Sequence, residues 1–462
     1  MTRLRPPAWV GRVRRSSGGV LWTASGLVLS SVATLAANLY MVAQAPVSTY
    51  ADIVVLTVTL FILGNVFRLG ADRIFVGEVH AAEHQSGVGA ATARGGSILA
   101  FALLSGLLAG LLVWLPPLST ILNRALSAPL TAYETLLVGV WLMSDVTRLV
   151  ASEGHRSRYK FALATISGMG ARAPLFLFLV LVLQFSGLGL QRVTLLLAAA
   201  LSSLIVSVVA FSTVGRLFPW WHGRPWQTAR PLWRGHMAMV ATTLAAGLIG
   251  GADVWIVGAT MRDSSVARYA FAVTMVAGIG ILSAAISSGL SPYLAAGLNN
   301  QDLERMRRMM VAQVRGSSLL AVIAYVGLLV LAEPLATLLG GDAYQGVLPL
   351  VALLGAGQLI GVLAGPSGGV ITVARMYRLA AIITVSVALA ALVLEAIAGF
   401  WGHSEVLIAL ASGAATGGYH VVNNIALSRR LSMTTHVFNR IGARRPRARR
   451  RDSSLPGNEQ PS

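Results

Sequence analysis

Residues 193–214 read VTLLLAAALSSLIVSVVAFSTV, a run of 22 residues without one charged side chain. A helix needs about 20 mostly apolar residues to cross the hydrocarbon core of a bilayer, so this run is long enough to span a membrane. In the whole chain 55% of the residues are hydrophobic and 11% are charged, and the mean hydropathy is +0.70. Soluble globular chains carry about 25% charged residues, so lipid is the main solvent of this protein.

Outward from residues 193–214, eleven further runs have a similar character, and together they predict an all-α polytopic membrane protein. The twelve predicted spans are 20–43, 52–69, 96–115, 133–152, 161–185, 193–214, 236–259, 268–290, 317–338, 346–366, 379–400 and 405–426. The first run follows a basic segment, as in a secretion signal, but it is longer than a typical signal core. We therefore expect it to be retained as the first helix.

The basic residues fall mainly on one side of the predicted membrane. If the N-terminus is cytoplasmic, every inner segment is rich in arginine, and the outer segments hold only Arg124, Arg192, Arg262 and Arg268. The positive-inside rule then places both termini in the cytoplasm, in agreement with an even number of spans. Because the net charge of +19 is spread over all inner segments, contact with anionic lipid headgroups explains it better than nucleic-acid binding.

The two halves of the chain share a weak internal repeat. A shift of 219 positions sets residues 47–51 (VSTYA) against 266–270 (VARYA). Six spans per half give both halves the same orientation, which predicts two pseudo-symmetric six-helix bundles around a central cavity. The predicted segments are a basic N-terminus (1–19), a first bundle (20–214), a basic and aromatic linker (215–235), a second bundle (236–426) and an arginine-rich, disordered tail (427–462).

Several kinds of chemistry have no signal in the sequence. The chain has no cysteine, no His, Asp and Glu cluster with metal-ligand spacing, no catalytic triad pattern and no Walker-type phosphate loop. We therefore expect no metal, no cofactor and no catalytic residues, and we expect transport that does not hydrolyse ATP within this chain.

A family resemblance rests on the order of motifs in the second half. GADVWIVG (251–258) leads into VARYA (266–270), then SPYL (291–294) and an amphipathic stretch at 300–310, and GGDAY (340–344) precedes the tenth span. This order resembles the polysaccharide and oligosaccharide-lipid flippases of the multidrug/oligosaccharidyl-lipid/polysaccharide (MOP) exporter superfamily. Their seventh helix contains an Asp, and their eighth begins with a Tyr and ends with a Pro.

The resemblance implies a flippase that moves a polyprenyl-diphosphate-linked oligosaccharide, as in lipopolysaccharide or exopolysaccharide biosynthesis, across the cytoplasmic membrane by alternating access. Twelve spans differ from the fourteen typical of lipid II flippases, and the first span has Asn38 where drug exporters often carry an acid. A multidrug exporter of the same superfamily stays as the alternative, and a membrane-embedded glycosyltransferase or polymerase is less favoured. Polysaccharide polymerases and glycosyltransferases are implied as partners.

Ionisable residues inside predicted spans are the candidate functional residues, because a charge in the hydrocarbon core is costly. Arg172 lies about half-way through the fifth span, where it would bind the diphosphate or pair with a carboxylate on a neighbouring helix. Asp145 and Arg148 lie three residues apart in the fourth span and can form a local ion pair. Arg148 is also a second candidate for cargo binding.

Coupling or gating is predicted for Asp253 in the seventh span and Glu395 in the eleventh, together with Asp145. A pairing of Glu395 with Arg172 is geometrically conceivable. Among uncharged residues, Asn38 and Gln358 are candidates for sugar binding, although hydrogen bonding between helices is the commoner role of such side chains. Gly365 and Pro366 predict a break in the tenth span, either a hinge or a simple helix end.

Overall fold

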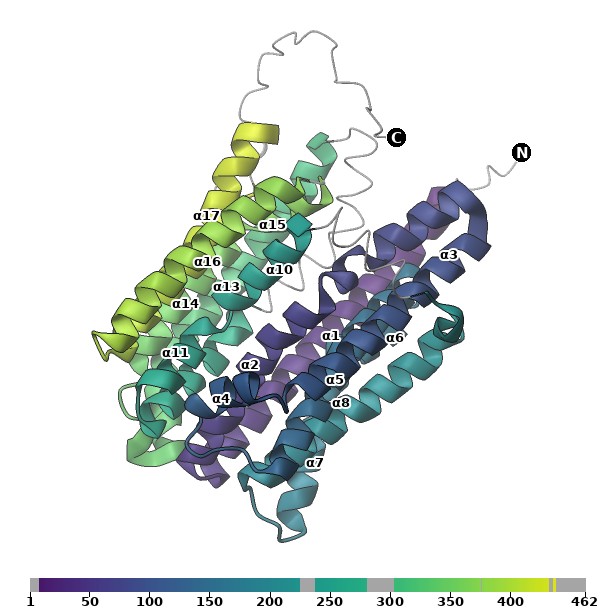
Figure 1. The fold of residues 1–462 in the computed structure, drawn as a ribbon. Coiled ribbons are helices and arrows are strands. Elements are labelled where there is room, and N and C mark those ends of the chain that lie inside the picture. Colours follow the sequence, from purple (N-terminus) through teal and green to yellow (C-terminus); the bar gives the residue numbers. More distant parts are fainter. Residues whose placement is uncertain (1–7, 225–236, 281–302, 375, 432–434, 438–462) are drawn as a thin grey trace.

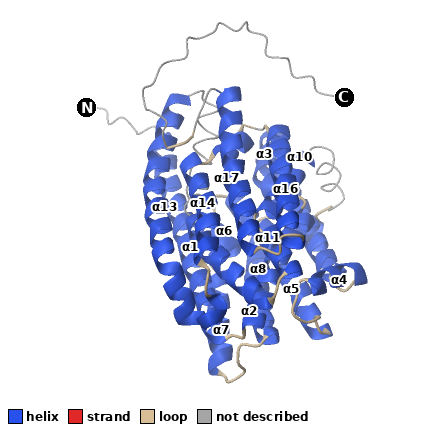
Figure 2. Ribbon diagram, turned by 90° about the vertical axis from the view of Figure 1, so that its left-hand side faces the viewer, coloured by secondary structure: helices blue, strands red, loops and turns tan. Residues whose placement is uncertain are grey.

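The computed structural model describes residues 8–224, 237–280, 303–374, 376–431 and 435–437, and within them every regular element is a helix (Figure 2). Residues 1–7 of the predicted N-terminus (1–19), residues 225–236 of the predicted linker, the SPYL motif and the tail after residue 437 lie outside the described residues, and residues 8–19 belong to the first helix. The prediction of an all-α membrane protein is confirmed.

The first half of the chain folds into one bundle of helices. Its elements are α1 (Ala8–Gln44), α2 (Val47–Arg68), α3 (Ala71–Leu112), α4 (Pro116–Arg124), α5 (Ala132–Ser157), α6 (Phe161–Thr165), the π-helical turn η1 (Ile166–Gly170), α7 (Arg172–Phe185), α8 (Arg192–Gly215) and the short η2 (Trp220–His222). Two residues with positive φ, Leu69 and Gly70, separate α2 from α3, and Gly87 (φ 83°) interrupts α3 where the chain folds back, which brings Glu78 and Arg94 within 2.6 Å.

The second half forms a second bundle beside the first (Figure 1). Its elements are α10 (Met237–Ile249), α11 (Ala252–Thr260), a helix over 263–280, α13 (Leu303–Gly340), η3 (Gly341–Tyr344), α14 (Leu348–Ala364), α15 (Ser367–Val373), α16 (Tyr377–Phe400) and α17 (Glu405–Leu431). The first turn of α1 and the last turn of α17 lie at the same end of the molecule, here called the terminal end. The other end is called the opposite end.

Each predicted span lies on a described helix over at least half of its length. By length and apolar composition, six helical stretches of the described residues could cross a membrane, or eight if two bent pairs each form one span. This number is below twelve for identifiable reasons. The stretch Val47–Leu112 joins two predicted spans, Leu348–Ala364 is short, and the described part of the eighth span ends at residue 280. The helix Glu405–Leu431, which carries the twelfth predicted span, is not apolar enough to be included.

The two bundles meet along α2, which packs against both α10 and α11. A Cβ atom built on Gly251 would lie 2.4 Å from Cγ1 of Val58, and one built on Gly258 would lie 3.0 Å from Cγ2 of Val55. At the opposite end the ring of Tyr50 lies 6.3 Å from the ring of Tyr344. The bundles are therefore in direct contact along most of α2, and near its last turns a Cβ atom on Gly247 would lie 2.8 Å from Nδ2 of Asn65.

Glycines allow α14 and α17 to approach each other within the second bundle. A Cβ atom on Gly357 would lie 2.2 Å from the carbonyl oxygen of Gly413, and a Cβ on Gly413 would lie 2.4 Å from the carbonyl oxygen of Leu353. Such contact between backbones is how small residues hold membrane helices together, where no hydrophobic effect drives them. Any larger residue at these two positions would push α14 and α17 apart.

The chain is broken at the predicted position: α14 ends at Ala364, α15 begins at Ser367, and Gly365 and Pro366 lie between them. Gly365 has φ 75°. A short segment of the tail, residues 435–437, packs against this break. The side chain of Thr435 donates to the carbonyl of Ala364 (2.7 Å), and the amide of Val437 donates to the carbonyl of Leu363 (2.9 Å). Together with the extension of α17 to Leu431, this order differs from the predicted disorder after residue 426.

At the opposite end, Arg192 links three elements of the first bundle. Its guanidinium bonds both carboxylate oxygens of Glu134 (2.8 and 2.9 Å), Asp52 (2.9 Å), and the carbonyls of Ala128 (2.8 Å) and Pro129 (3.0 Å). The side chains of Arg192, Asp52 and Glu134 are only 14%, 4% and 7% exposed. This Arg192 cluster ties α2, α5 and α8 together.

Replacing Arg192 by alanine is expected to destabilise the protein by about 3–5 kcal/mol, because two buried carboxylates lose their cation. Thermal unfolding of the purified protein in detergent measures this as a lower midpoint. The control is Arg124→Ala, which removes an exposed arginine at the same end of the molecule. Equal midpoints for the two variants would contradict a stabilising role for the Arg192 cluster.

Candidate functional site

Arg172 begins α7, directly after the π-helical turn η1, and its side chain lies between α5 and α8. Its Nε donates to the hydroxyl of Ser203 (2.8 Å) and lies 3.8 Å from Oδ1 of Asp145. The guanidinium carbon lies 5.0 Å from the centre of the Trp141 ring, a cation–π contact with a buried side chain. Among the described residues, the two terminal NH2 groups of Arg172 have no hydrogen-bond partner.

Asp145 is shared between two arginines. Its Oδ1 accepts from Nε of Arg148 (2.8 Å) and from the hydroxyl of Ser203 (3.1 Å), and Arg172 is the more distant cation. Arg148 also donates to the carbonyl of Gly168, inside η1. A π-helical turn disturbs the regular helical hydrogen bonds, so a side-chain donor here supports the 45° bend between α6 and α7. The local Asp145–Arg148 pair and an Arg172–carboxylate pair therefore both exist.

Arg68, at the end of α2, belongs to the same group of charges, although the sequence indicated it only as one of many inner arginines. It donates to the side chain of Asn65, its Nε lies 3.4 Å from Asp72, and its side chain is 4% exposed. Its charge interacts with those of Asp145 and Arg148. The spacings Asn65–Arg68 and Arg68–Asp72, three and four residues, were the available sequence signal.

We call Arg68, Asp72, Asp145, Arg148 and Arg172 the arginine cluster. Three arginines face two aspartates, so the cluster carries one excess positive charge. The side chains of Arg68 and Arg148 are 4% and 6% exposed, and that of Arg172 is 23% exposed. Uncompensated charge inside a membrane bundle is costly, so an anion that enters beside Arg172 would be stabilised.

The second bundle holds two buried carboxyl groups close together. Asp253, in the first turn of α11, accepts from the hydroxyls of Tyr269 (2.8 Å) and Ser412 (2.8 Å). Glu395, on α16, is 2% exposed, its Oε2 has no hydrogen-bond partner, and its charge interacts with that of Asp253. Neither carboxyl group forms an ion pair with a described residue. The conceivable pairing of Glu395 with Arg172 was wrong, because Arg172 pairs with Asp145 in the other bundle.

Asn38 and Gln358 do not join the arginine cluster. Asn38 bonds the carbonyl of Thr34 (2.8 Å) and accepts from the hydroxyl of Tyr50 (3.3 Å), at the contact between the bundles. Gln358 lies in the second bundle, where its Oε1 would be 2.9 Å from a Cβ on Gly280. The structure therefore brings together Arg172, Arg148 and Asp145, and separately Asp253 and Glu395, and it leaves these two amides apart from both groups.

Comparisons with known proteins give a family and a fold. Residues 91–349 match the family described as polysaccharide biosynthesis protein. No curated protein matches the chain significantly. Among solved structures, MATE in complex with MaL6 has a TM-score of 0.66 at 12% identity, covering 90% of this chain and 96% of that one.

Two further structures give the same result. The inward closed conformation of the lipid II flippase MurJ has a TM-score of 0.64 at 14% identity, with 88% of this chain and 87% of that chain covered. An outward-facing multidrug resistance MATE transporter of the MOP superfamily has a TM-score of 0.64 at 14% identity, with 90% and 95% covered. At such identities the likeness concerns the fold, whereas the family match covers more than half of the chain. The chain thus belongs to the polysaccharide biosynthesis protein family, as a multi-pass membrane protein with the fold of the MOP superfamily.

Proposed function

We propose that the protein moves a polyprenyl-diphosphate-linked oligosaccharide across the cytoplasmic membrane by alternating access, without chemical change to its cargo. The observation that carries this proposal is the excess positive charge of the arginine cluster. A diphosphate supplies the missing negative charge, and it accepts hydrogen bonds from planar guanidinium groups in a bidentate manner.

In this mechanism Arg172 touches the diphosphate through its two terminal NH2 groups. Ser203 and Trp141 fix the orientation of the guanidinium, and Asp145 keeps it from leaving the bundle when no cargo is bound. Arg148 and Arg68 contribute charge from positions closer to the terminal end. The terminal end faces the cytoplasm in this proposal, so the cluster meets cargo made on that side, and the inner arginines contact anionic lipid.

The direct test is leaflet-specific labelling of lipid-linked sugar in proteoliposomes that contain the purified protein. Three probes separate the possibilities: a polyprenyl-diphosphate oligosaccharide, the same oligosaccharide on a neutral lipid, and a cationic dye. Transfer of the first probe alone supports the proposal. Equal transfer of the diphosphate and neutral lipids would contradict the role of the arginine cluster in cargo binding. Transport of the dye alone would overturn the proposal.

The second candidate function is export of cationic drugs, and the Asp253–Glu395 pair favours it. Two buried carboxyl groups that have no arginine or lysine paired with them in the described part of the chain could receive a cationic molecule. We instead assign the pair to coupling, because small cations or protons fit a site that is only 6% exposed at Asp253 and 2% at Glu395. The dye probe distinguishes these two roles.

Glu395→Gln is expected to abolish the stimulation of transport by a sodium or proton gradient while leaving gradient-independent exchange of cargo. The reason is that the neutral amide can no longer alternate between cation-bound and cation-free states. The measurement is the leaflet assay under imposed gradients, with Asp342→Asn, an exposed carboxylate, as the matched control. Full stimulation in the Glu395 variant would show that coupling resides elsewhere.

A further inference from the structure

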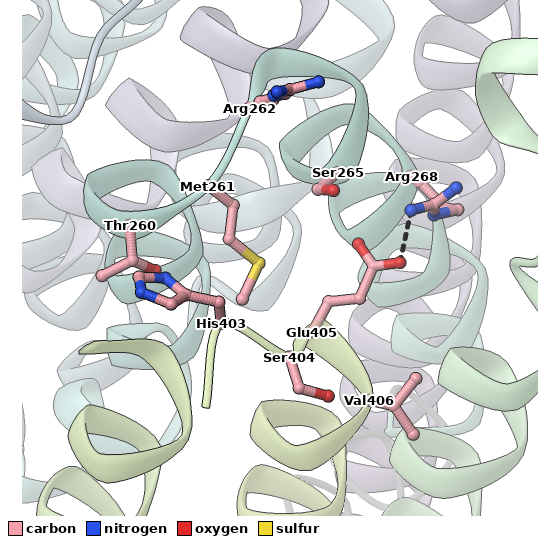
Figure 3. A pocket seen from close by; sticks show the side chains of 9 residues that line it. All are labelled: Thr260, Met261, Arg262, Ser265, Arg268, His403, Ser404, Glu405 and Val406. Carbon is pink, nitrogen blue, oxygen red and sulfur yellow. Dashed lines mark ion pairs between the residues drawn. The ribbon is translucent and has the colours of Figure 1, made fainter. Parts of the chain in front are cut away.

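A cavity of about 510 Å³ opens at the opposite end of the second bundle, and neither Asp253, Glu395 nor any residue of the arginine cluster lines it. Figure 3 shows it between the end of α11 with the start of the following helix on one side and the loop joining α16 to α17 on the other. Its lining residues are Thr260, Met261, Arg262, Ser265, Arg268, His403, Ser404, Glu405 and Val406. Its volume lies within the range of small-molecule sites, about 300–1,000 Å³.

Two lining residues of the cavity differ in character from the residues at the corresponding positions of the first bundle. The shift of 219 positions sets Val42 against Met261, and superposing the starts of α8 and α17 sets Leu190 against His403. Val42 and Leu190 are 5% and 4% exposed and belong to the main apolar core, whereas His403 is exposed and Met261 is half-buried. At these two positions the first bundle therefore has buried apolar side chains, where the second bundle has lining residues of the cavity.

The charged residues at the starts of α8 and α17 also differ between the two bundles. When the starts of α8 and α17 are superposed, Arg192 corresponds to Glu405, so a basic residue in the first bundle corresponds to an acidic residue in the second. Arg192 is fully bonded within its cluster. In the second bundle, Glu405 pairs with Arg268 (2.5 Å), and Arg268 donates to the carbonyl of Gln345 (2.8 Å). Oε2 of Glu405 and Nε of Arg268 are buried and have no hydrogen-bond partner among the described residues.

The remaining polar groups of the cavity add a second positive charge. Arg262 is exposed and has no ion-pair partner among the described residues, so the lining carries two arginines against one glutamate. Ser265, Ser404 and Thr260 contribute hydroxyls, and His403 contributes an imidazole on a backbone with φ 45°. A non-glycine residue with positive φ is uncommon and is often found at functional sites.

We infer that this cavity binds an acidic sugar, a saccharide that carries a carboxylate beside its hydroxyls. Neighbouring sugar hydroxyls can form hydrogen bonds with the hydroxyls of Ser265 and Ser404 and with the imidazole of His403, which line the cavity. The sugar carboxylate would pair with Arg262. The inference rests on the proposed function, because the sugar of a transported cargo emerges at the opposite end.

The test is saturation-transfer NMR on the full-length protein in lipid nanodiscs, with glucuronate and glucose as probes. The native protein is expected to transfer saturation to both sugars and to prefer glucuronate by about threefold, the order expected for one exposed ion pair. Arg262→Ala should remove this preference, and Ser265→Trp, which fills the cavity, should abolish both signals. Arg124→Ala, an exposed arginine outside the cavity, should behave as the native protein does.

No signal in the native protein, an unchanged signal in Ser265→Trp, or a retained preference in Arg262→Ala would each overturn the inference. If Ser265→Trp does not fold, the Arg262 comparison still decides, because that side chain is exposed. The binding measurement is independent of transport. Sugar binding without flipping of any lipid-linked cargo would reject the proposed function but not sugar binding by the cavity. Flipping without sugar binding would reject sugar binding by the cavity but not the proposed function.

Discussion

Arg172→Ala should lower the initial rate of diphosphate-linked cargo transfer roughly a hundredfold when cargo is below saturation. Hydrogen bonds to charged groups contribute about 1.5–3 kcal/mol each, so the loss of two bonds to phosphate oxygens costs at least about 3 kcal/mol. The folded state should survive, because Asp145 keeps its closer partner Arg148. The measurement is the leaflet assay on proteoliposomes, with protein incorporation matched between variants.

Two further variants make this result specific. Arg172→Lys keeps the charge but loses the planar, bidentate donor, so we expect an intermediate rate. Arg156→Ala removes an arginine that is 40% exposed at the end of α5, and it should transport at the native rate. A native rate in a folded Arg172→Ala variant would exclude Arg172 from cargo binding, whatever the cargo is.

Cross-linking the two bundles should stop transport completely and reversibly. The Cβ of Val58 on α2 lies 3.7 Å from the position of a Cβ on Gly251, between α10 and α11. This separation falls within the range of about 3.5–4.5 Å found in disulfides. The native chain has no cysteine, so Val58→Cys with Gly251→Cys introduces the only thiols. Oxidation should reduce cargo transfer to the level of empty liposomes, and reduction should restore it.

The matched control is a cross-link inside one bundle. A Cβ on Gly106 of α3 would lie 3.6 Å from the Cβ of Val146 on α5, so this pair can also form a disulfide. Alternating access moves the bundles as units, and oxidation of Gly106→Cys with Val146→Cys should leave transport intact. If the α2–α11 disulfide forms quantitatively and transport continues, the bundles do not separate at this contact during the cycle.

The fold could be predicted from the sequence because membrane solvation leaves few choices. Apolar runs of about 20 residues must be helical, since every backbone polar group in lipid needs a partner within its own segment. The break at Gly365 was also predictable from its neighbour Pro366. The turn η1 was not, because a π-helical turn depends on the register of backbone hydrogen bonds, and residues 166–170 (ISGMG) do not by themselves specify that register.

The candidate residues and the local Asp145–Arg148 pair were predictable from the sequence, but which side chains of other helices each candidate would contact was not. Arg172 and Glu395 stand out because they are charged within apolar runs, but their partners depend on how each helix is rotated and on which bundle it joins. Arg172 therefore pairs with Asp145, whereas Glu395 lies in the other bundle and forms no ion pair with a described residue. Arg68 was missed because it lies at the end of a span, where an arginine ordinarily reaches the lipid headgroups.

The segment at 435–437 determines where the chain can be shortened. Its composition and its position beyond α17 would lead an experimenter to delete everything after Leu431 as a dispensable tail. Such a deletion would remove the hydrogen bonds that the Thr435 hydroxyl donates to the carbonyl of Ala364 and the Val437 amide donates to the carbonyl of Leu363. Acceptors at the α14–α15 break would lose their donors, so the shortest chain that keeps this region intact ends after Val437, and reporter proteins are best fused beyond that residue.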